Sequence, residues 1–502
     1  MNLSAALRRT TTALIALSVV LAGNAIGQSI TIASPGTTGA LIDPQKNNTI
    51  AAYTVSQLLA DPLLYYLDGE YQGRLATDWT FDEASLTYTF NLRQGVAFQN
   101  GVPFTADAVV FSIERILDQD DPLPLAGALA NVVAVRAVDD ATVEIEINTV
   151  NPDFLLNLAL AYIVEPSSAA DGGTAVGSGP YTVTDYEPDQ RIVLSRFDGY
   201  WDGTPELAEI IVRNIPDPGT LVLELEAGTV DLIMFTPPME VVRLGGAGFT
   251  PMPFVAVNSA YVALNNANLD LDLRQAICYA IDRDVVLSTA YAGLGQPQFT
   301  VARDDGWARD TSVSGYSYDP ERAMQILDAA GIVDGDGDGW REIDGQNIDL
   351  DFQSRGDGEW LLSTQIIQQF LEDVGLRSSI TTSERLTYYD AVRLGDYDLG
   401  WFISNAQPEP PIMNGIFHST EFWNVTQVPR DDLDVFIDTG RGTADQAART
   451  EAYFGLQRVI YEDAVQCPMF WVEQAHVANS DLDGVRVSAQ GVLLNGHQWS
   501  KP

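Results

Sequence analysis

The chain has 502 residues, of which 46% are hydrophobic and 19% charged, and its formal net charge is −42 at pH 7. This composition supports folded cores and argues against disorder, and the length predicts about three domains. So acidic a surface repels nucleic-acid phosphates and anionic lipid headgroups, so we expect neither as a partner. We interpret the acidity as a solubilising surface, with an acidic cleft for cationic ligands as the alternative.

Residues 1–27 have the pattern of a secretory signal. Arg8 and Arg9 precede an uncharged apolar run over residues 13–22, and small residues lead to Gly27. This run is short for a bilayer span, which needs about 20 residues, so we expect a cleaved signal peptide rather than a retained anchor. No cysteine lies near the expected cleavage point. The sequence therefore predicts an exported protein without a lipid anchor.

Four segments have the patterns of β-strands. Residues 86–92 and 143–147 alternate apolar and polar side chains with period two, which is typical of half-buried strands. Residues 190–197 and 208–215 are rich in β-branched residues and predict two further strands.

Helices are predicted from capping residues and apolar stripes. Residues 105–117 open on Thr105 as a candidate N-cap, and residues 319–331 carry an N-cap aspartate, a first-turn proline and a terminal glycine. Residues 273–282 and 360–375 predict two more helices. Mixed helices and strands without an internal repeat indicate an α/β (mixed α+β) protein of several lobes.

The motifs of the common enzyme classes are absent from the sequence. Neither lysine, Lys46 nor Lys501, follows a glycine, which excludes a Walker-type phosphate loop. The three histidines, His418, His476 and His497, lie far apart, and there is no H-E-x-x-H or G-x-S-x-G. We therefore expect no catalytic residues and no cofactor. A secreted hydrolase with an acid pair among the 69 Asp and Glu residues is the alternative.

The two cysteines, Cys278 and Cys467, are distant in the sequence. Export permits a disulfide between them, and two buried thiols are equally compatible with the sequence. The pairing is therefore left open.

An acidic loop offers a weak candidate for calcium. Asp334, Asp336 and Asp338 occupy the first, third and fifth positions of a calcium loop, and Gly339 the sixth. The twelfth position, where a bidentate glutamate is needed, holds Gly345. We therefore interpret the loop as an Asp/Gly turn and predict no metal site.

Five long blocks of the sequence carry a family signature: residues 73–116, 177–201, 271–286, 318–339 and 397–411. In this order they resemble the family 5 extracellular solute-binding proteins. These proteins serve ABC importers for oligopeptides, dipeptides, nickel and related solutes.

The resemblance implies a periplasmic-binding-protein-like clam shell of two lobes with a third, inserted domain. Lobe I would comprise residues 28–50, 177–258 and 475–502, the inserted domain II residues 51–176, and lobe III residues 259–474. A solute would bind between the lobes, which close on it by hinge motion. We expect a periplasmic monomer that delivers its solute to an inner-membrane permease with ATPase subunits.

The block "DLGWFISNAQPEP" implies part of the ligand site. In peptide-binding members a tryptophan at this strand end lines the cleft, and an aspartate three residues later pairs with the ligand's α-ammonium. Trp401 matches the tryptophan, with Phe402 beside it, but Ser404 holds the place of the aspartate and Asn405 follows. Neutral side chains lack the charge assistance that strengthens such a bond, so a requirement for a free amine is left open. Core packing of Trp401 and loop polarity of Ser404 are the alternatives.

Arg355 is the candidate for receiving a ligand carboxylate, because dipeptide-binding relatives place an arginine at a similar strand-to-helix position. A salt bridge to Asp357 or Glu359 is the alternative. We expect a peptide or peptide-like ligand. An opine, an amine conjugate, a short saccharide or a nickel chelate is the alternative, although His418 is the only imidazole near the block.

Overall fold

The computed structural model describes residues 28–36, 42–47, 49–67, 70–151, 154–169, 175–303, 306–356, 358–406, 411–421, 423–427, 431–443, 445–488 and 490–502. The side chains of residues 255–257, 405–406 and 411–412 are not described. The predicted signal segment, residues 1–27, lies outside the described residues. In the described part of the chain, no helix is both long enough and apolar enough to cross a membrane.

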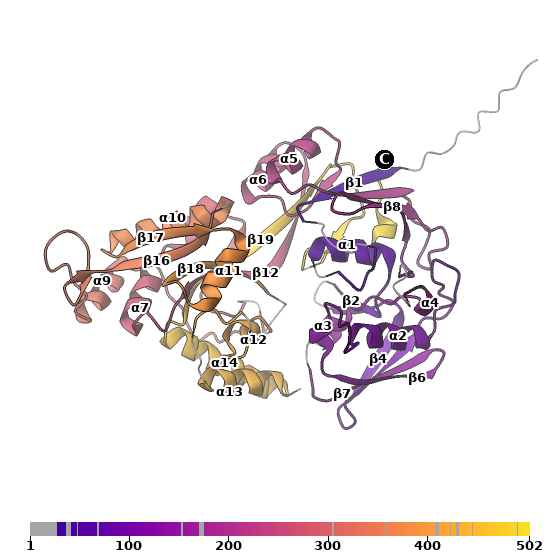
Figure 1. The fold of residues 1–502 in the computed structure, drawn as a ribbon, viewed down its shortest axis with the longest axis horizontal. Coiled ribbons are helices and arrows are strands. Elements are labelled where there is room, and N and C mark those ends of the chain that lie inside the picture. Colours follow the sequence, from indigo (N-terminus) through magenta and orange to yellow (C-terminus); the bar gives the residue numbers. More distant parts are fainter. Residues whose placement is uncertain are drawn as a thin grey trace, which may run out of the picture.

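One eleven-stranded sheet runs through most of the molecule, in the order β17-β16-β18-β12-β19-β11-β1-β10-β9-β8, with β13 also paired to β19. Its strands are β1 (Ser29–Ser34), β8 (Tyr181–Glu187), β9 (Arg191–Arg196), β10 (Glu209–Asn214), β11 (Leu232–Ile233), β12 (Thr250–Leu264), β13 (Gly295–Pro297), β16 (Asp349–Arg355), β17 (Arg377–Ser383), β18 (Leu399–Ala406) and β19 (Gln466–Ala478). The long strands β12 and β19 cross between the two halves of the molecule (Figure 1). The sheet therefore belongs to both lobes.

The stretch predicted as lobe III has its own hydrophobic core around one end of this sheet. Its helices are α7 (Leu271–Ala280), α8 (Arg283–Ala290), α9 (Pro320–Ala329), α10 (Gly358–Asp373), α11 (Arg385–Leu394), α12 (Pro411–Phe417), α13 (Asp431–Arg441) and α14 (Gln446–Glu462), and a hairpin pairs β14 (Glu342–Ile343) with β15 (Gln346–Asn347). The Asp319 side chain accepts a hydrogen bond from the Arg322 N–H at the start of α9, as its capping pattern predicts.

A disulfide joins Cys278 of α7 to Cys467 of β19, with the two Cα atoms 5.2 Å apart. The alternative left open by the sequence, two buried thiols, is thereby excluded.

The other end of the sheet forms lobe I. Its helices are α1 (Ile50–Leu59), α5 (Pro218–Glu226) and α6 (Pro238–Gly246), and the C-terminal segment adds β20 (Arg486–Val487), β21 (Leu493–Leu494) and a 3₁₀ turn at Gly496–Gln498. All but the first residue of α1 lies in the stretch predicted as domain II, but its apolar residues, Val55 and Leu58 among them, pack in the lobe I core.

Domain II is built on a four-stranded sheet with a separate core. Its elements are β2 (Leu64–Leu67), β3 (Glu70–Gly73), β4 (Ala76–Asp82), β5 (Thr87–Leu92), α2 (Ala106–Ile116), a 3₁₀ turn (Gly127–Leu129), β6 (Val132–Asp139), β7 (Thr142–Ile147), α3 (Phe154–Leu158) and α4 (Pro166–Ala169). The alternation predicted for β5 and β7 is confirmed, since Tyr88, Phe90 and Leu92 are buried on one face of β5. Thr105 occupies the N-cap position of α2, but its side chain makes no capping hydrogen bond.

A buried ion pair and its hydrogen bonds fasten domain II to lobe I. The Asp61 carboxylate accepts hydrogen bonds from Arg74 (3.0 Å), Tyr200 (3.0 Å), Trp201 (2.9 Å) and Ser178 (3.0 Å). Asp61 is fully buried and the Arg74 guanidinium lies against the Trp201 ring, 4.7 Å from its centre. The Tyr-Trp pair that ends the block of residues 177–201 therefore binds the Asp61 carboxylate.

Candidate ligand-binding cleft

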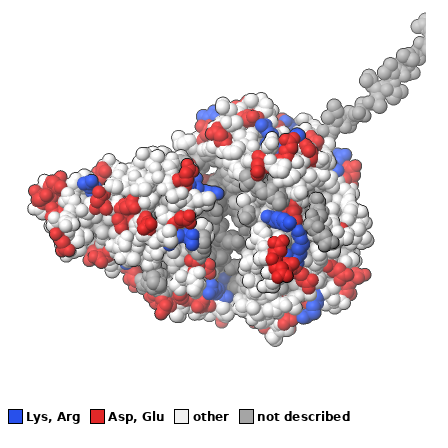
Figure 2. Space-filling model, viewed as in Figure 1, with Lys and Arg blue, Asp and Glu red and all other residues white. Residues whose placement is uncertain are grey.

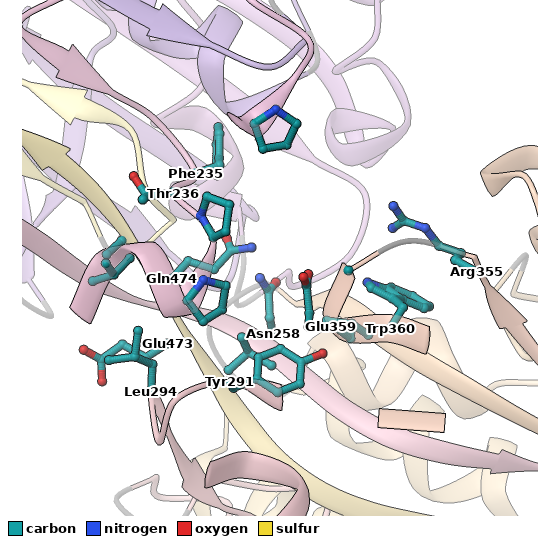
Figure 3. Close-up of a pocket in the computed structure, with 18 of the residues that line it drawn as sticks. Phe235, Thr236, Asn258, Tyr291, Leu294, Arg355, Glu359, Trp360, Glu473 and Gln474 are labelled. Atoms are coloured by element: carbon teal, nitrogen blue, oxygen red, sulfur yellow. The ribbon is translucent and has the colours of Figure 1, made fainter. Parts of the chain in front are cut away.

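A cleft of about 490 Å³ opens where lobe I faces lobe III. Lobe I contributes residues 235–238 and the starts of α5 and α6, and lobe III contributes residues 358–360 at the start of α10, together with Tyr291. Asn258 of β12 and Gln474 of β19 lie between these two walls (Figure 3). The cleft is thus placed at the junction of the lobes.

The crossing strands are irregular directly beneath the cleft. Phe254 of β12 pairs with Gln474 of β19, but the next pair is Asn258 with Val472, so residues 255–257 lie opposite Glu473 alone. Extra residues in one strand bend it and increase its local twist. The lobe boundaries predicted after residues 258 and 474 fall at this bulge.

The lobe I wall is a short segment that follows β11. Phe235 has φ +55°, a left-handed conformation that is costly for a bulky residue. Its N–H donates to Nδ1 of His476 (3.1 Å), and the Thr236 N–H donates to the Ala475 carbonyl (3.0 Å). Pro237 then begins the turn into α6. Two backbone N–H groups of this wall therefore bind β19, one at a side chain and one at a main-chain carbonyl, and hold the wall on the crossing strand.

The lobe III wall carries aromatic and charged groups. The Arg355 guanidinium lies over the Trp360 ring, 4.6 Å from its centre. Tyr291, one residue after α8, is 1% exposed, and burial raises the pKa of its hydroxyl above the ordinary range. The phenol therefore stays protonated at neutral pH.

The described lining of the cleft is balanced in charge, with Arg355 and Arg385 against Glu359 and Glu473. Figure 2 shows basic side chains on both sides of the opening between the two halves, and acidic side chains spread widely over the rest of this face. The alternative of an acidic cleft for cationic ligands is not supported by this lining.

Trp401 and Phe402 are both buried and are not among the residues lining the cleft. Trp401 is 0% exposed and packs against Phe470 with 5.8 Å between ring centres. Phe402 points to the other face of β18, where its ring lies 5.7 Å from that of Tyr389. Trp401 therefore packs in the core of lobe III, and its contact with a ligand stays a prediction.

Ser404 also lies outside the described lining of the cleft. It is buried, and its hydroxyl donates to the Ser259 carbonyl on the neighbouring strand (3.4 Å). Asn405 pairs through its backbone position with Asn258, but its side chain lies outside the described residues. Ile403, between Phe402 and Ser404, points to the opposite face of β18 and lines the cleft.

Arg355 lines the cleft, which agrees with its expected position, and its contact with a ligand stays a prediction. Its neighbour Asp357 lies outside the described residues. The wall at Phe235 and Thr236 was not predicted from the sequence. Two prolines directly after an apolar strand, Pro237 and Pro238, repeat the strand-to-loop pattern of the 398–410 block and could have revealed it.

The acidic loop forms turns of its own. Asp334 accepts hydrogen bonds from the N–H groups of Gly337 (2.7 Å) and Gly339 (3.0 Å), and Asp336 accepts one from Asp338 (3.0 Å). Carboxylate oxygens of the three aspartates lie within 4.8 Å of one another, and all three residues are exposed. These hydrogen bonds form the turn that the Asp/Gly interpretation predicts, and calcium binding stays the alternative.

His418 lies outside the described lining of the cleft, and its Nδ1 accepts a hydrogen bond from the Thr420 N–H (3.2 Å). The imidazole considered for nickel is thus engaged in a local turn.

The family model of the bacterial extracellular solute-binding proteins, family 5 (middle region), matches residues 70–424, more than two-thirds of the chain. The chain belongs to this family. It is similar to heme-binding protein A of Haemophilus influenzae, with 26% identity over 80% of this chain and 78% of that protein. The dipeptide-binding protein of Escherichia coli is 26% identical over 78% of this chain and 79% of that protein.

The crystal structure of NikA from Brucella suis in complex with Fe(III)-EDTA superposes with a TM-score of 0.85 at 24% identity, covering 94% of this chain and 100% of that one. The two-lobed family fold predicted from the sequence is therefore confirmed.

Proposed function

We propose that this protein captures a peptide or peptide-like solute in the cleft and delivers it to the permease of an ABC importer, whose ATPase subunits supply the energy. It acts in the periplasm as a monomer without catalytic activity. The observation that carries the proposal is the cleft itself, since both lobes and the two crossing strands contribute to its lining.

The size and lining of the cleft support a small-molecule ligand. Its volume of about 490 Å³ lies within the usual range for such pockets, about 300–1,000 Å³. Aromatic rings and a few polar groups line its walls, as is common in sites that bury most of a ligand. The bulge at Phe254–Asn258 gives the crossing strands a place to bend as the lobes close.

The charges of the lobe III wall favour a solute with both a cation and an anion. Arg355 suits a carboxylate, because its planar guanidinium donates two parallel hydrogen bonds. Glu359, at the start of α10 in the same wall, suits an ammonium group. A short peptide carries both groups, and a relative of this chain is named for binding dipeptides.

A non-peptide ligand is the second candidate. Another relative is named for binding heme, so similarity within the family does not fix the solute. An opine, an amine conjugate, a short saccharide or a metal chelate would then fill the same cleft.

Native mass spectrometry of the freshly purified protein tests the proposal. We expect a retained peptide, released on denaturation and identified by fragmentation. A retained non-peptide molecule would favour the second candidate. Turnover of an added peptide into fragments would contradict a transport role and support a hydrolase.

A further inference from the structure

The buried imidazole of His476 connects three segments around the cleft. Its Nδ1 accepts a hydrogen bond from the Phe235 N–H (3.1 Å), and its Nε2 lies 2.8 Å from the Gly491 carbonyl oxygen. A backbone N–H can only donate and a carbonyl can only accept, so the ring is neutral and carries its proton on Nε2. His476 thereby ties β19 to the lobe I wall and to the C-terminal segment.

Close packing fixes the plane of this ring. The Phe254 ring lies 4.6 Å from it, and the Phe235 ring meets it edge-on at 5.3 Å between centres. Gly491 has φ +89°, and a Cβ at this position would lie 2.5 Å from the Phe254 ring. Glycine therefore allows the 491 carbonyl to reach Nε2.

The hydrogen bond to Nδ1 holds Phe235 where its backbone is strained. A left-handed phenylalanine persists only when its surroundings compensate for the unfavourable conformation. Phe235 and the three residues that follow it line the cleft, as do Glu473 and Gln474, just before His476 on β19. The His476 side chain thus contacts the lobe I wall, and it belongs to the strand whose residues Glu473 and Gln474 also line the cleft.

We propose that His476 is a positioning residue for solute binding, which fixes the lobe I wall on the crossing strand through its Nδ1 and sets the shape of the cleft without touching the solute. The inference rests on the proposed function, since it concerns the capture of a solute in this cleft. The hydrogen bond between Phe235 and His476 would then influence specificity although His476 is not among the residues that line the cleft.

The charge state of the imidazole suits this role. Burial lowers the pKa of His476 to about 4, and the hydrogen bond to the Gly491 carbonyl opposes that shift only in part. No charged side chain among the described residues contributes to the shift. At neutral pH the acceptor at Nδ1 is therefore intact. Protonation would place an N–H against the Phe235 N–H and break the contact.

Two substitutions separate positioning from packing. His476→Phe keeps an aromatic ring between Phe235 and Phe254 but removes both hydrogen bonds. His476→Gln keeps one acceptor and one donor in a neutral side chain. Leu194→Ala, in the lobe I core and outside the described lining of the cleft, controls for a general loss of stability.

The wild type is first offered an equimolar mixture of free-acid di- and tripeptides, and the peptide that it retains best is identified. Each variant is then titrated calorimetrically with that peptide. We expect His476→Phe to weaken binding about tenfold, the effect of leaving a buried N–H unpaired. We expect His476→Gln to recover most of that loss. Leu194→Ala should lower the melting temperature and leave affinity unchanged.

Each result decides between the two proposals. Equal affinities of the wild type and His476→Phe would overturn the positioning role and leave the peptide function standing. Weakening by Leu194→Ala to the same extent as by His476→Phe would also overturn it, because stability alone would then control affinity. A wild-type protein that retains no peptide would overturn the peptide function and, with it, this inference.

Discussion

His476 also makes the stability of the protein depend on pH. Its pKa is about 4 in the folded protein, against 6.5 without burial. Between these values the unfolded chain binds more protons, so the stabilising contribution is complete above pH 6.5 and is lost as the pH falls towards 4. One pH unit corresponds to about 1.4 kcal/mol per proton, so from pH 7 to pH 5 we expect His476 to reduce the free energy of unfolding by about 2 kcal/mol.

Urea denaturation of the wild type and His476→Gln at both pH values measures this loss. The variant lacks the titrating group, so its stability should fall less over the same range. Identical pH dependence in the two proteins would show that His476 is not buried in its neutral form.

Trp401 is expected to act through the core. Because its indole is fully buried against Phe470, Trp401→Ala should reduce the free energy of unfolding by about 3–5 kcal/mol, the usual cost of such a deletion. Any loss of peptide affinity should accompany this destabilisation. A variant with an unchanged denaturation midpoint but much weaker binding would place Trp401 on the cleft surface instead.

Ser404→Asp tests whether this position can receive an ammonium group. The structure buries Ser404 on the face of β18 opposite Ile403, so a carboxylate there would lose its hydration without meeting a solute. We expect lower stability and equal affinities for free and N-acetylated forms of one peptide. A selective gain for the free amine would return Ser404 to the ligand site.

At the scale of secondary-structure elements, the joint between domain II and lobe I depends on Asp61. Asp61→Asn removes the fully buried counter-charge of Arg74 and leaves only the partly exposed Asp202, 2.7 Å away, as its ion-pair partner. Breaking a buried pair typically costs about 3–5 kcal/mol, and we expect a loss towards the lower end of that range because Asp202 remains. Asp198→Asn removes the exposed ion pair with Arg196 and should cost less than about 1 kcal/mol. Denaturant titration compares the two variants. Equal midpoints would mean that the buried network contributes no more than a surface pair.

Local patterns predicted the elements that depend on neighbouring residues. The alternation of β5 and β7 and the caps of α9 depend only on residues within segments of about ten residues. The sequence was therefore sufficient to predict these elements. Leu86 was expected in β5, but it lies in the turn that connects β4 to β5 and has φ +51° there.

Contacts between distant segments were not predictable in the same way. Alternation shows that Trp401 and Ile403 share a face of β18, but only the packing of lobe III decides that Ile403 reaches the cleft and Trp401 does not. The bond from Phe235 to His476 joins residues 241 positions apart, and nothing local to either residue indicates it. Arg355 was expected at the cleft because a family resemblance supplied its position, and its contact with a ligand stays a prediction.

For the whole molecule, we expect closure of the lobes on a bound solute. We expect the two halves to rotate at the bulge between β12 and β19, so the radius of gyration should fall when peptide is bound. Small-angle scattering with and without a saturating peptide measures the change, and we expect its forward intensity to correspond to the mass of a monomer. An unchanged radius at saturation would contradict hinge closure.

The disulfide has a practical consequence for observing that motion. Both cysteines of the sequence are joined to each other, so the chain offers no free thiol to a maleimide dye. Leu223→Cys on α5 and Leu386→Cys on α11, at side chains 66% and 72% exposed, would add one labelling point to each lobe beside the cleft. A donor and an acceptor dye on these two thiols would convert solute capture into an optical signal, without any change to the native cysteines.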